Sequence, residues 1–216
     1  MSVDGCLSAL LTRGLVRTRP AADMLAPSSL LSESGAPLPF DHARLLSLSN
    51  GLDAYGGYFR VFGVGPWSVR DMRRWNAPEG WRRAWDGRAD GWWFIGETAW
   101  GDQYAYATGD DPLEFDATVY RLDACRLEAE PVAPCFADFL RDELARNATA
   151  PRDETTVAAR RRFGDLEPSV QLTYVPSLLA GGDEDLAHVV ELGAREAMTL
   201  AGDSYRALAA VPAATA

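Results

Sequence analysis

The stretch WWFIGETAWGDQYAY, residues 92–106, decides the fold class that this sequence predicts. It contains six aromatic residues and two carboxylates, Glu97 and Asp102. Two aromatic-rich runs flank a segment that carries Gly96 and Gly101, and glycine tolerates the backbone angles that tight turns require. This order of strand, glycine-containing loop and strand predicts a β-hairpin.

The aromatic rings of this hairpin are expected to pack across its strands. Successive side chains of a strand point to opposite faces, so Trp93 and Ile95 should share one face of the first strand. Tyr104 and Tyr106 should likewise share one face of the second. Rings on a sheet could also stack nucleic-acid bases, but such platforms carry basic residues nearby, and this loop carries acids. A structural role is therefore expected for most of the rings.

Further strand-like runs extend the hairpin into an antiparallel meander. They are rich in aromatic and β-branched residues and are separated by glycine, aspartate and proline turn signals. In chain order they are YFRVFGV (58–64), WWFIG (92–96), DQYAYAT (102–108), ATVYRLDAC (117–125) and RLEAE (126–130). The sequence thus predicts an α+β fold with a central, mostly antiparallel sheet flanked by helices.

Two helices are expected before the first predicted strand. One is predicted within residues 5–18 from the spacing of its apolar residues. The segment DHARLLSLSNG (41–51) predicts another, capped by Asp41 and stopped by Asn50 and Gly51. Between these two helices, a segment rich in proline, serine and alanine is expected to act as a connector.

Later segments predict more helices and a further strand. SVRDMRRW begins with Ser68 as a helix cap, and Asp71 three positions later resembles a capping box. The segment 134–146 predicts an amphipathic helix with Phe136, Phe139, Leu140 and Leu144 on one stripe. Beyond it, VQLTY (170–174) reads as a strand and the last residues as a helix. These elements divide the chain into three predicted segments. They are an N-terminal helix and connector (1–37), an α+β domain (38–148) and a mainly helical extension packed on the same core (149–216).

Composition excludes several function classes. All 21 basic residues are arginine, because the chain contains no lysine. A Walker loop, a Schiff-base enzyme, and a nuclease or kinase that relies on lysine are thereby excluded. The net charge of −10 argues against nucleic-acid binding, which needs a basic face. No apolar run reaches the ~20 residues of a membrane-spanning helix, so no membrane partner is expected.

The few cysteines and histidines predict no metal or other cofactor. Cys6, Cys125 and Cys135 have no metal-like spacing, and His42 and His188 lie far apart. Three unpaired thiols suit a reducing compartment. The N-terminus carries an acid and no small-residue cleavage site, so it does not resemble a signal peptide. A cytoplasmic location is expected.

Acidic residues concentrate in the second half of the meander. Residues 97–154 hold fourteen acids and five arginines, whereas residues 60–90 hold seven arginines and four acids. Such a surface can attract a basic partner and speed its encounter. The candidate partner-binding residues are Glu97, Trp100, Asp102, Asp110, Asp111 and Glu114.

The same acids also permit an enzymatic hypothesis. A carboxylate-dependent hydrolase acting on a glycoside or polymer needs two carboxyl groups in an aromatic-lined cleft, and Glu97, Asp102 or Asp110 could supply them. An acid beside a glycine more often caps a turn with its side-chain oxygen, as Asp102 beside Gly101 would. We therefore expect no catalytic residues.

The order of these segments resembles that of the SUKH superfamily, the family of the yeast cell-wall synthesis regulator and many bacterial immunity proteins. The resemblance covers roughly residues 38–146. It rests on LPFDHARLLSLSNG, YFRVFGV, WFIGETAWGDQYAYAT, VYRLDA and PCFADFLRDEL in that order. The tail LTYVPSLLAGGDEDLAHVV is similar to a VP-x-L-x-x-GG-x-x-x-L pattern of type VI secretion immunity proteins, except that Leu179 and Ala180 stand in reverse order.

The resemblance implies an α+β domain that acts without catalysis. Bacterial members typically bind a cognate secreted toxin and neutralise it. An acidic face would suit a basic toxin such as a nuclease, because carboxylates can take the place of substrate phosphates. A regulatory protein-interaction module is the alternative, and the oligomeric state stays open.

Overall fold

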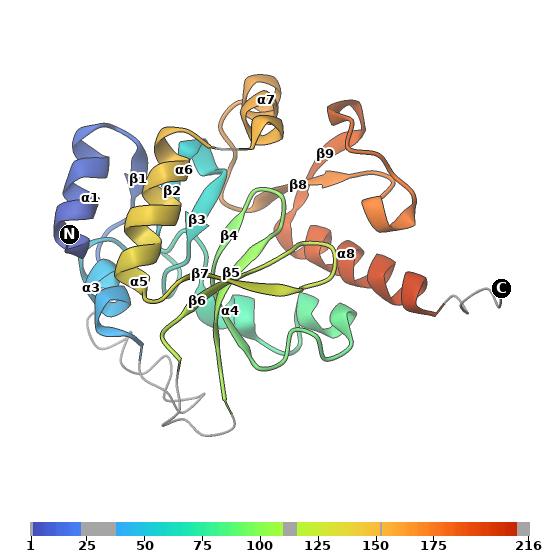
Figure 1. Ribbon diagram of the computed structural model, residues 1–216, viewed down its shortest axis with the longest axis horizontal. Coiled ribbons are helices and arrows are strands. Elements are labelled where there is room, and N and C mark those ends of the chain that lie inside the picture. Colours follow the sequence, from blue (N-terminus) through green and yellow to red (C-terminus); the bar gives the residue numbers. More distant parts are fainter. Residues whose placement is uncertain (1, 23–37, 110–115, 152, 211–216) are drawn as a thin grey trace.

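The structure is a computed structural model that describes residues 2–22, 38–109, 116–151 and 153–210 (Figure 1). Its centre is a seven-stranded antiparallel sheet in which each strand pairs with the next one along the chain. The strands are β1 (Val16–Thr18), β2 (Leu52–Ala54), β3 (Phe59–Val61), β4 (Trp92–Thr98), β5 (Gln103–Ala107), β6 (Val119–Leu122) and β7 (Ala129–Ala133). This meander confirms the predicted α+β class.

Helices cover both faces of the sheet. Tyr104 on β5 packs its ring 4.8 Å from that of Phe139, whereas the preceding Gln103 accepts a hydrogen bond from Trp75 Nε1 at 2.8 Å. Neighbouring strand residues point to opposite faces, so Phe139 and Trp75 lie on opposite sides. The face on which Phe139 lies is covered by α1 (Val3–Thr12), α3 (Phe40–Leu48), α5 (Phe136–Asp138), η4 (Phe139–Leu144) and α6 (Ala145–Thr149). The face on which Trp75 lies is covered by α4 (Met72–Asn76), η2 (Trp81–Trp85) and α8 (Ala194–Ala209).

The C-terminal segment packs against the sheet domain. It contains α7 (Glu154–Phe163), the antiparallel pair β8 (Val170–Tyr174) and β9 (Val189–Gly193), and α8. Figure 1 shows β8, β9 and α8 together beside the β4–β5 hairpin. Trp85 Nε1 donates to the carbonyl of Met198 at 2.9 Å, and a Cβ at Gly202 would lie only 2.7 Å from the carbonyl oxygen of Ala84. Helix α8 therefore lies in close contact with η2.

Short one-turn helices connect these elements. They are η1 (Tyr55–Gly57), η5 (Leu178–Ala180) and η6 (Leu186–His188). Within the part of the chain that the structure describes, no helix is long and apolar enough to cross a membrane.

Several predicted packing relationships are confirmed. Tyr104 and Tyr106 are both fully buried, and Tyr106 contacts His42 on the side that carries α3. The predicted stripe of the helical segment 136–149 is buried throughout, at Phe136, Phe139, Leu140 and Leu144. A bulge between Phe94 and Gly96 interrupts the strict alternation from which Trp93 and Ile95 were assigned to one face.

Three local predictions are wrong in detail. The first helix ends at Thr12, and residues 16–18 form β1 instead, paired with β2. Helix α3 has Pro39 at its N-cap position, with Asp41 in its first turn. Helix α4 is capped by Asp71, whose side chain accepts from the N–H of Arg73, and not by Ser68.

Gly96 was assigned to the hairpin turn but lies inside β4. A Cβ there would be 2.5 Å from the carbonyl oxygen of Arg60 on β3. The glycine is therefore needed for the close approach of two strands.

Candidate functional site

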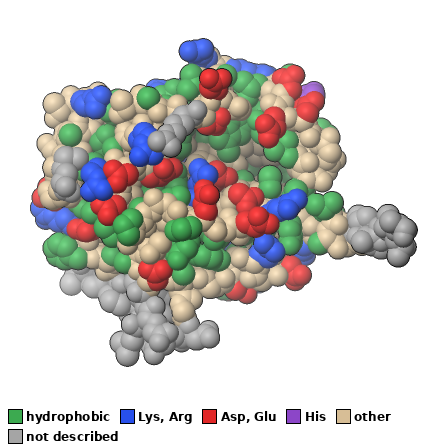
Figure 2. Space-filling model, viewed as in Figure 1, with side chains coloured by type: hydrophobic (Ala, Val, Ile, Leu, Met, Phe, Trp, Pro, Cys, Tyr) green, Lys and Arg blue, Asp and Glu red, His purple; other side chains and the backbone are tan. Residues whose placement is uncertain are grey.

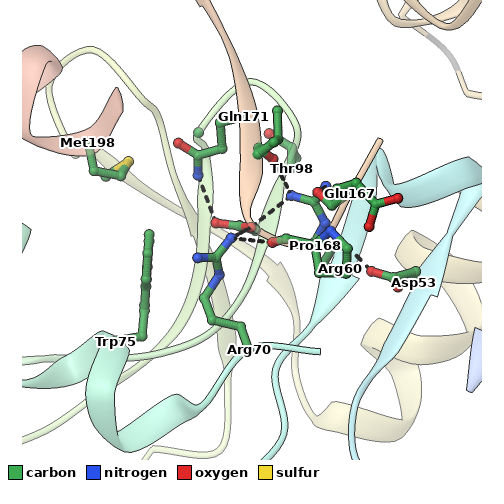
Figure 3. A network of polar contacts seen from close by, with 12 residues as sticks. Asp53, Arg60, Arg70, Trp75, Thr98, Glu167, Pro168, Gln171 and Met198 are labelled. Carbon is green, nitrogen blue, oxygen red and sulfur yellow. Dashed lines mark hydrogen bonds and ion pairs between the residues drawn. The ribbon is translucent and has the colours of Figure 1, made fainter. Parts of the chain in front are cut away.

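Glu97 lies in the interior of the protein, where its carboxylate is bound by Arg60, Arg70 and Gln171. Figure 3 shows the contacts of these three labelled side chains converging on one point. It pairs directly with Arg60 across β3 and β4, and neither side chain has any exposed area. Glu97 Oε1 accepts from Arg60 Nη1 at 3.0 Å and from Arg70 Nη2 at 2.6 Å, and Oε2 accepts from Gln171 Nε2 at 2.7 Å. The assignment of Glu97 to the partner-binding surface is thus corrected, because its carboxylate is enclosed by its own chain.

The same two arginines hold the C-terminal segment. Arg60 donates to the carbonyls of Val170 and Glu167, each at 2.8 Å, and Arg70 donates to that of Pro168 at 2.8 Å. A buried backbone carbonyl that lacks a partner costs free energy. The network therefore supplies partners for the chain that enters β8 and fixes β8 against the sheet.

Trp100 and Asp102 lie at the tip of the same hairpin and line a cleft of about 330 Å³. The cleft is enclosed by the β4–β5 turn, the β6–β7 turn, the start of α7, strand β8 and helix α8. Leu172, Leu178 and Met198 provide apolar surface inside it. A cavity of this size, with apolar walls and a few polar groups, has the dimensions of a ligand or side-chain site.

One wall of the cleft is aromatic. The rings of Trp100 and Tyr174 stack with centroids 5.4 Å apart and planes 10° from parallel. Trp100 Nε1 donates to Thr156 Oγ1 at 2.8 Å, so the indole is fixed against α7. The indole is thus held both by this hydrogen bond and by stacking on Tyr174.

Four carboxylates border the cleft: Asp102, Asp123, Asp153 and Glu184. No arginine or histidine is among the described residues that line it. Figure 2 shows acidic side chains around the hollow in the middle of this face. The cleft is therefore negative and has no cation of its own.

The carboxylates of the cleft differ in how many hydrogen bonds they accept from backbone N–H groups of this chain. Asp153 caps α7 by accepting from the N–H groups of Thr155 and Thr156. Asp123 accepts from three backbone N–H groups of the β6–β7 turn. Asp102 Oδ1 accepts from the N–H of Ala124 at 2.9 Å.

The pKa values of the cleft reflect its apolar and negative surroundings. Burial raises the pKa of Asp102, against the smaller lowering effect of the hydrogen bond from Ala124. Burial also raises the pKa of the Cys125 thiol, and the nearby charges of Asp123 and Asp102 raise it further. The pKa of Tyr174 is raised by burial and then by Glu184 and Asp153. Burial is thus the main cause of all three raised pKa values, nearby carboxylates add to it, and Arg121 partly offsets it at Asp102.

The remaining predicted site residues, Asp110, Asp111 and Glu114, lie outside the described residues. Of the predicted set, the structure brings Trp100 and Asp102 together and separates Glu97 from them. The sequence did not predict which other residues line the cleft, because they come together only through tertiary packing. They lie within 123–125, 153–155 and 171–201. A weak sequence signal exists at Gln171, a polar residue inside the apolar strand VQLTY.

Neither a protein-family model nor a curated protein matches the chain. Among solved structures, the crystal structure of Atu4351 from Agrobacterium tumefaciens is similar, with a TM-score of 0.57 over 90% of this chain and 87% of that one. The two sequences are 11% identical in that comparison. At this identity the likeness shows the fold alone, and function has to be argued from the site.

Proposed function

We propose that this chain is a non-catalytic, cytoplasmic immunity protein that binds a cognate secreted toxin and neutralises it by stoichiometric association. The observation that carries the proposal is the cleft itself. It combines two aromatic rings and apolar surface with four carboxylates, and the described residues that line it include no cation. Such a surface complements the charge of a basic partner better than that of nucleic acid or an anionic substrate.

The position of Glu97 rules out the carboxylate pair Glu97–Asp102 on which the hydrolase hypothesis relied. A glycosidase needs two carboxyl groups that face one substrate. Both oxygens of Glu97 accept hydrogen bonds from Arg60, Arg70 and Gln171, so Glu97 does not face the cleft that Asp102 lines. No group of three or more potential metal ligands occurs among the described residues.

The toxin fits best as a basic protein such as a nuclease. Carboxylates around the cleft could occupy the positions that phosphates take in the toxin's own substrate. The same surface would serve a regulatory module that recruits a client protein, so the experiment must separate the two roles.

Co-expression provides that test. The toxin-like C-terminal region of a secreted protein encoded beside this chain is expressed alone and together with the chain, and cell survival is counted. Survival should be restored by the chain and lost when Asp102, Asp123, Asp153 and Glu184 are all changed to the corresponding amides. Equal killing with and without the chain would contradict the immunity role for that pair. As a control, Glu130→Gln changes a carboxylate that does not line the cleft.

A further inference from the structure

The side-chain amide of Gln171 has one partnered end and one end without a partner. Its orientation is fixed, because the nitrogen donates to Glu97 Oε2 at 2.7 Å and an ionised carboxylate only accepts. The amide oxygen must then face the other way. It is buried and has no hydrogen-bond partner among the described residues, although Gln171 has no exposed surface. A buried acceptor of this kind costs about 1–3 kcal/mol unless something donates to it.

This oxygen is directed toward the floor of the cleft. Figure 3 shows it on the side of the amide that faces Met198, and both residues line the cleft. A Cβ built on Gly101 would lie 3.6 Å from Gln171 Oε1 and 3.5 Å from Met198 Sδ. Gly101, Gln171 and Met198 therefore meet at one corner of the cleft. Met198 is buried there and its sulfur accepts from Gln103 Nε2 at 3.7 Å, so a donor reaches Gln171 Oε1 only when this flexible, unbranched side chain moves aside.

The other groups of the cleft select a planar cation as that donor. Trp100 and Tyr174 both line the cleft, and aromatic rings of this kind stack a guanidinium better than an ammonium. Glu184 is exposed at the rim, and among the described residues the carboxylate of Asp102 accepts one hydrogen bond, at Oδ1 from the N–H of Ala124. A guanidinium carries five N–H donors in a fixed fork and can reach several acceptors together.

We propose that the cleft receives an arginine side chain of the partner protein, which donates to Gln171 Oε1 and is neutralised by Asp102 and Glu184. The methylene stem then packs on Leu172 and Leu178. This inference rests on the proposed function and names the chemistry by which the partner is recognised. A free arginine molecule fits less well, because the described lining offers no cation for its α-carboxylate.

The test uses capped amino acids as probes of the purified full chain. N-acetyl-arginine amide is titrated while NMR follows the Trp100 indole N–H, the Gln171 side-chain amide and the Met198 methyl group. All three signals should shift and saturate. The citrulline analogue, which lacks the charge, and the asymmetric dimethylarginine analogue, which keeps the charge but blocks donors, should each bind about tenfold more weakly or worse.

Variants locate the contact. Asp102→Asn with Glu184→Gln should weaken binding of N-acetyl-arginine amide about tenfold, the loss expected for charge-assisted hydrogen bonds. Asp203→Asn on the exposed part of α8 is the matched control and should leave the affinity unchanged. Equal binding of arginine and citrulline probes, or arginine binding that leaves the Gln171 and Met198 signals unmoved, would overturn the proposal.

The two proposals can fail separately. If toxin protection holds while the arginine probe fails to bind, the arginine site is wrong and the immunity role stands. If the probe binds as expected while protection fails, the site stands and the immunity role is wrong.

Discussion

The buried network around Glu97 and the open cleft beside Asp102 show how one hairpin uses two acids in opposite ways. Glu97 is removed from water but surrounded by Arg60, Arg70 and Gln171. Asp102 is partly removed from water without an ion pair, and burial raises its pKa. The ion pairs of Glu97 hold strands and segments of the fold together, whereas the carboxylate of Asp102 has no ion-pair partner among the described residues. Two acids of similar chemistry thus differ because of what faces them across the strands.

Removing the charge of Glu97 should have the largest effect on stability. Glu97→Gln leaves two buried guanidiniums without their shared counter-ion, and breaking a buried pair typically costs about 3–5 kcal/mol. Urea unfolding at pH 7 should show this loss in the free energy of unfolding. A loss below about 1 kcal/mol would remove the contrast between the two acids, because Glu97 would then behave as a surface residue.

His42 tests a third case, a buried ionisable group with no charged partner. Burial lowers its pKa from 6.5 to about 3, and its ring stacks on Phe136 at 4.3 Å. Between pH 6.5 and pH 3 the unfolded chain therefore binds a proton that the folded chain does not. Stability should fall as the pH falls through this window, by up to about 1.4 kcal/mol per pH unit from this group.

Comparison with His42→Phe isolates this contribution from those of the carboxylates. The difference in unfolding free energy between the two proteins should change steadily from pH 7 to pH 4 in urea titrations. If the two pH profiles run parallel, His42 has the same pKa in the folded and the unfolded chain, and burial does not lower it.

Gly202→Ala tests the contact that places α8 at the edge of the cleft. The new Cβ would lie 2.7 Å from the carbonyl oxygen of Ala84, so the backbones must separate, at about 1–3 kcal/mol. This outweighs the gain of about 1 kcal/mol that alanine brings to a helix. Thermal unfolding measures the loss, and Thr199→Ala on the exposed face of α8 provides a control. An unchanged or stabilised Gly202→Ala protein would mean that α8 adjusts freely.

Asp102→Asn should have the smallest effect. The raised pKa of Asp102 in the folded state means that its contribution is present below about pH 3.8 and is lost as the pH rises through the folded value. At pH 7 the carboxylate is thus a cost, and asparagine can still accept from Ala124. Stability should stay within about 0.5 kcal/mol or rise, as measured by thermal unfolding. A large loss would place Asp102 in the structural class of Glu97.

The sequence predicts the parts of the fold that depend on local pattern. Aromatic and β-branched runs indicated β3 to β6, and the apolar spacing of Phe136, Phe139 and Leu140 indicated the helical segment behind them. The run predicted at 126–130 overlaps β7 only at residues 129 and 130. Strand β1 escaped prediction because it has three residues and gains its partner, β2, from tertiary pairing.

The site was predictable only in part. An acidic, aromatic loop indicated Trp100 and Asp102, but sequence does not show which acids meet a buried arginine. One clue was present, since Arg60 and Glu97 interrupt apolar strands with opposite charges. Their pairing depends on register across β3 and β4, which a single sequence does not reveal.

The cleft joins parts of the chain made at very different times during synthesis. Its hairpin wall belongs to the meander, whereas Met198 and Leu200 belong to the final helix. A nascent chain that has already folded its sheet still lacks the opposite wall, so the cleft is completed last. A premature stop before α8 would therefore yield a polypeptide that keeps all nine described strands but lacks the helical wall of the cleft.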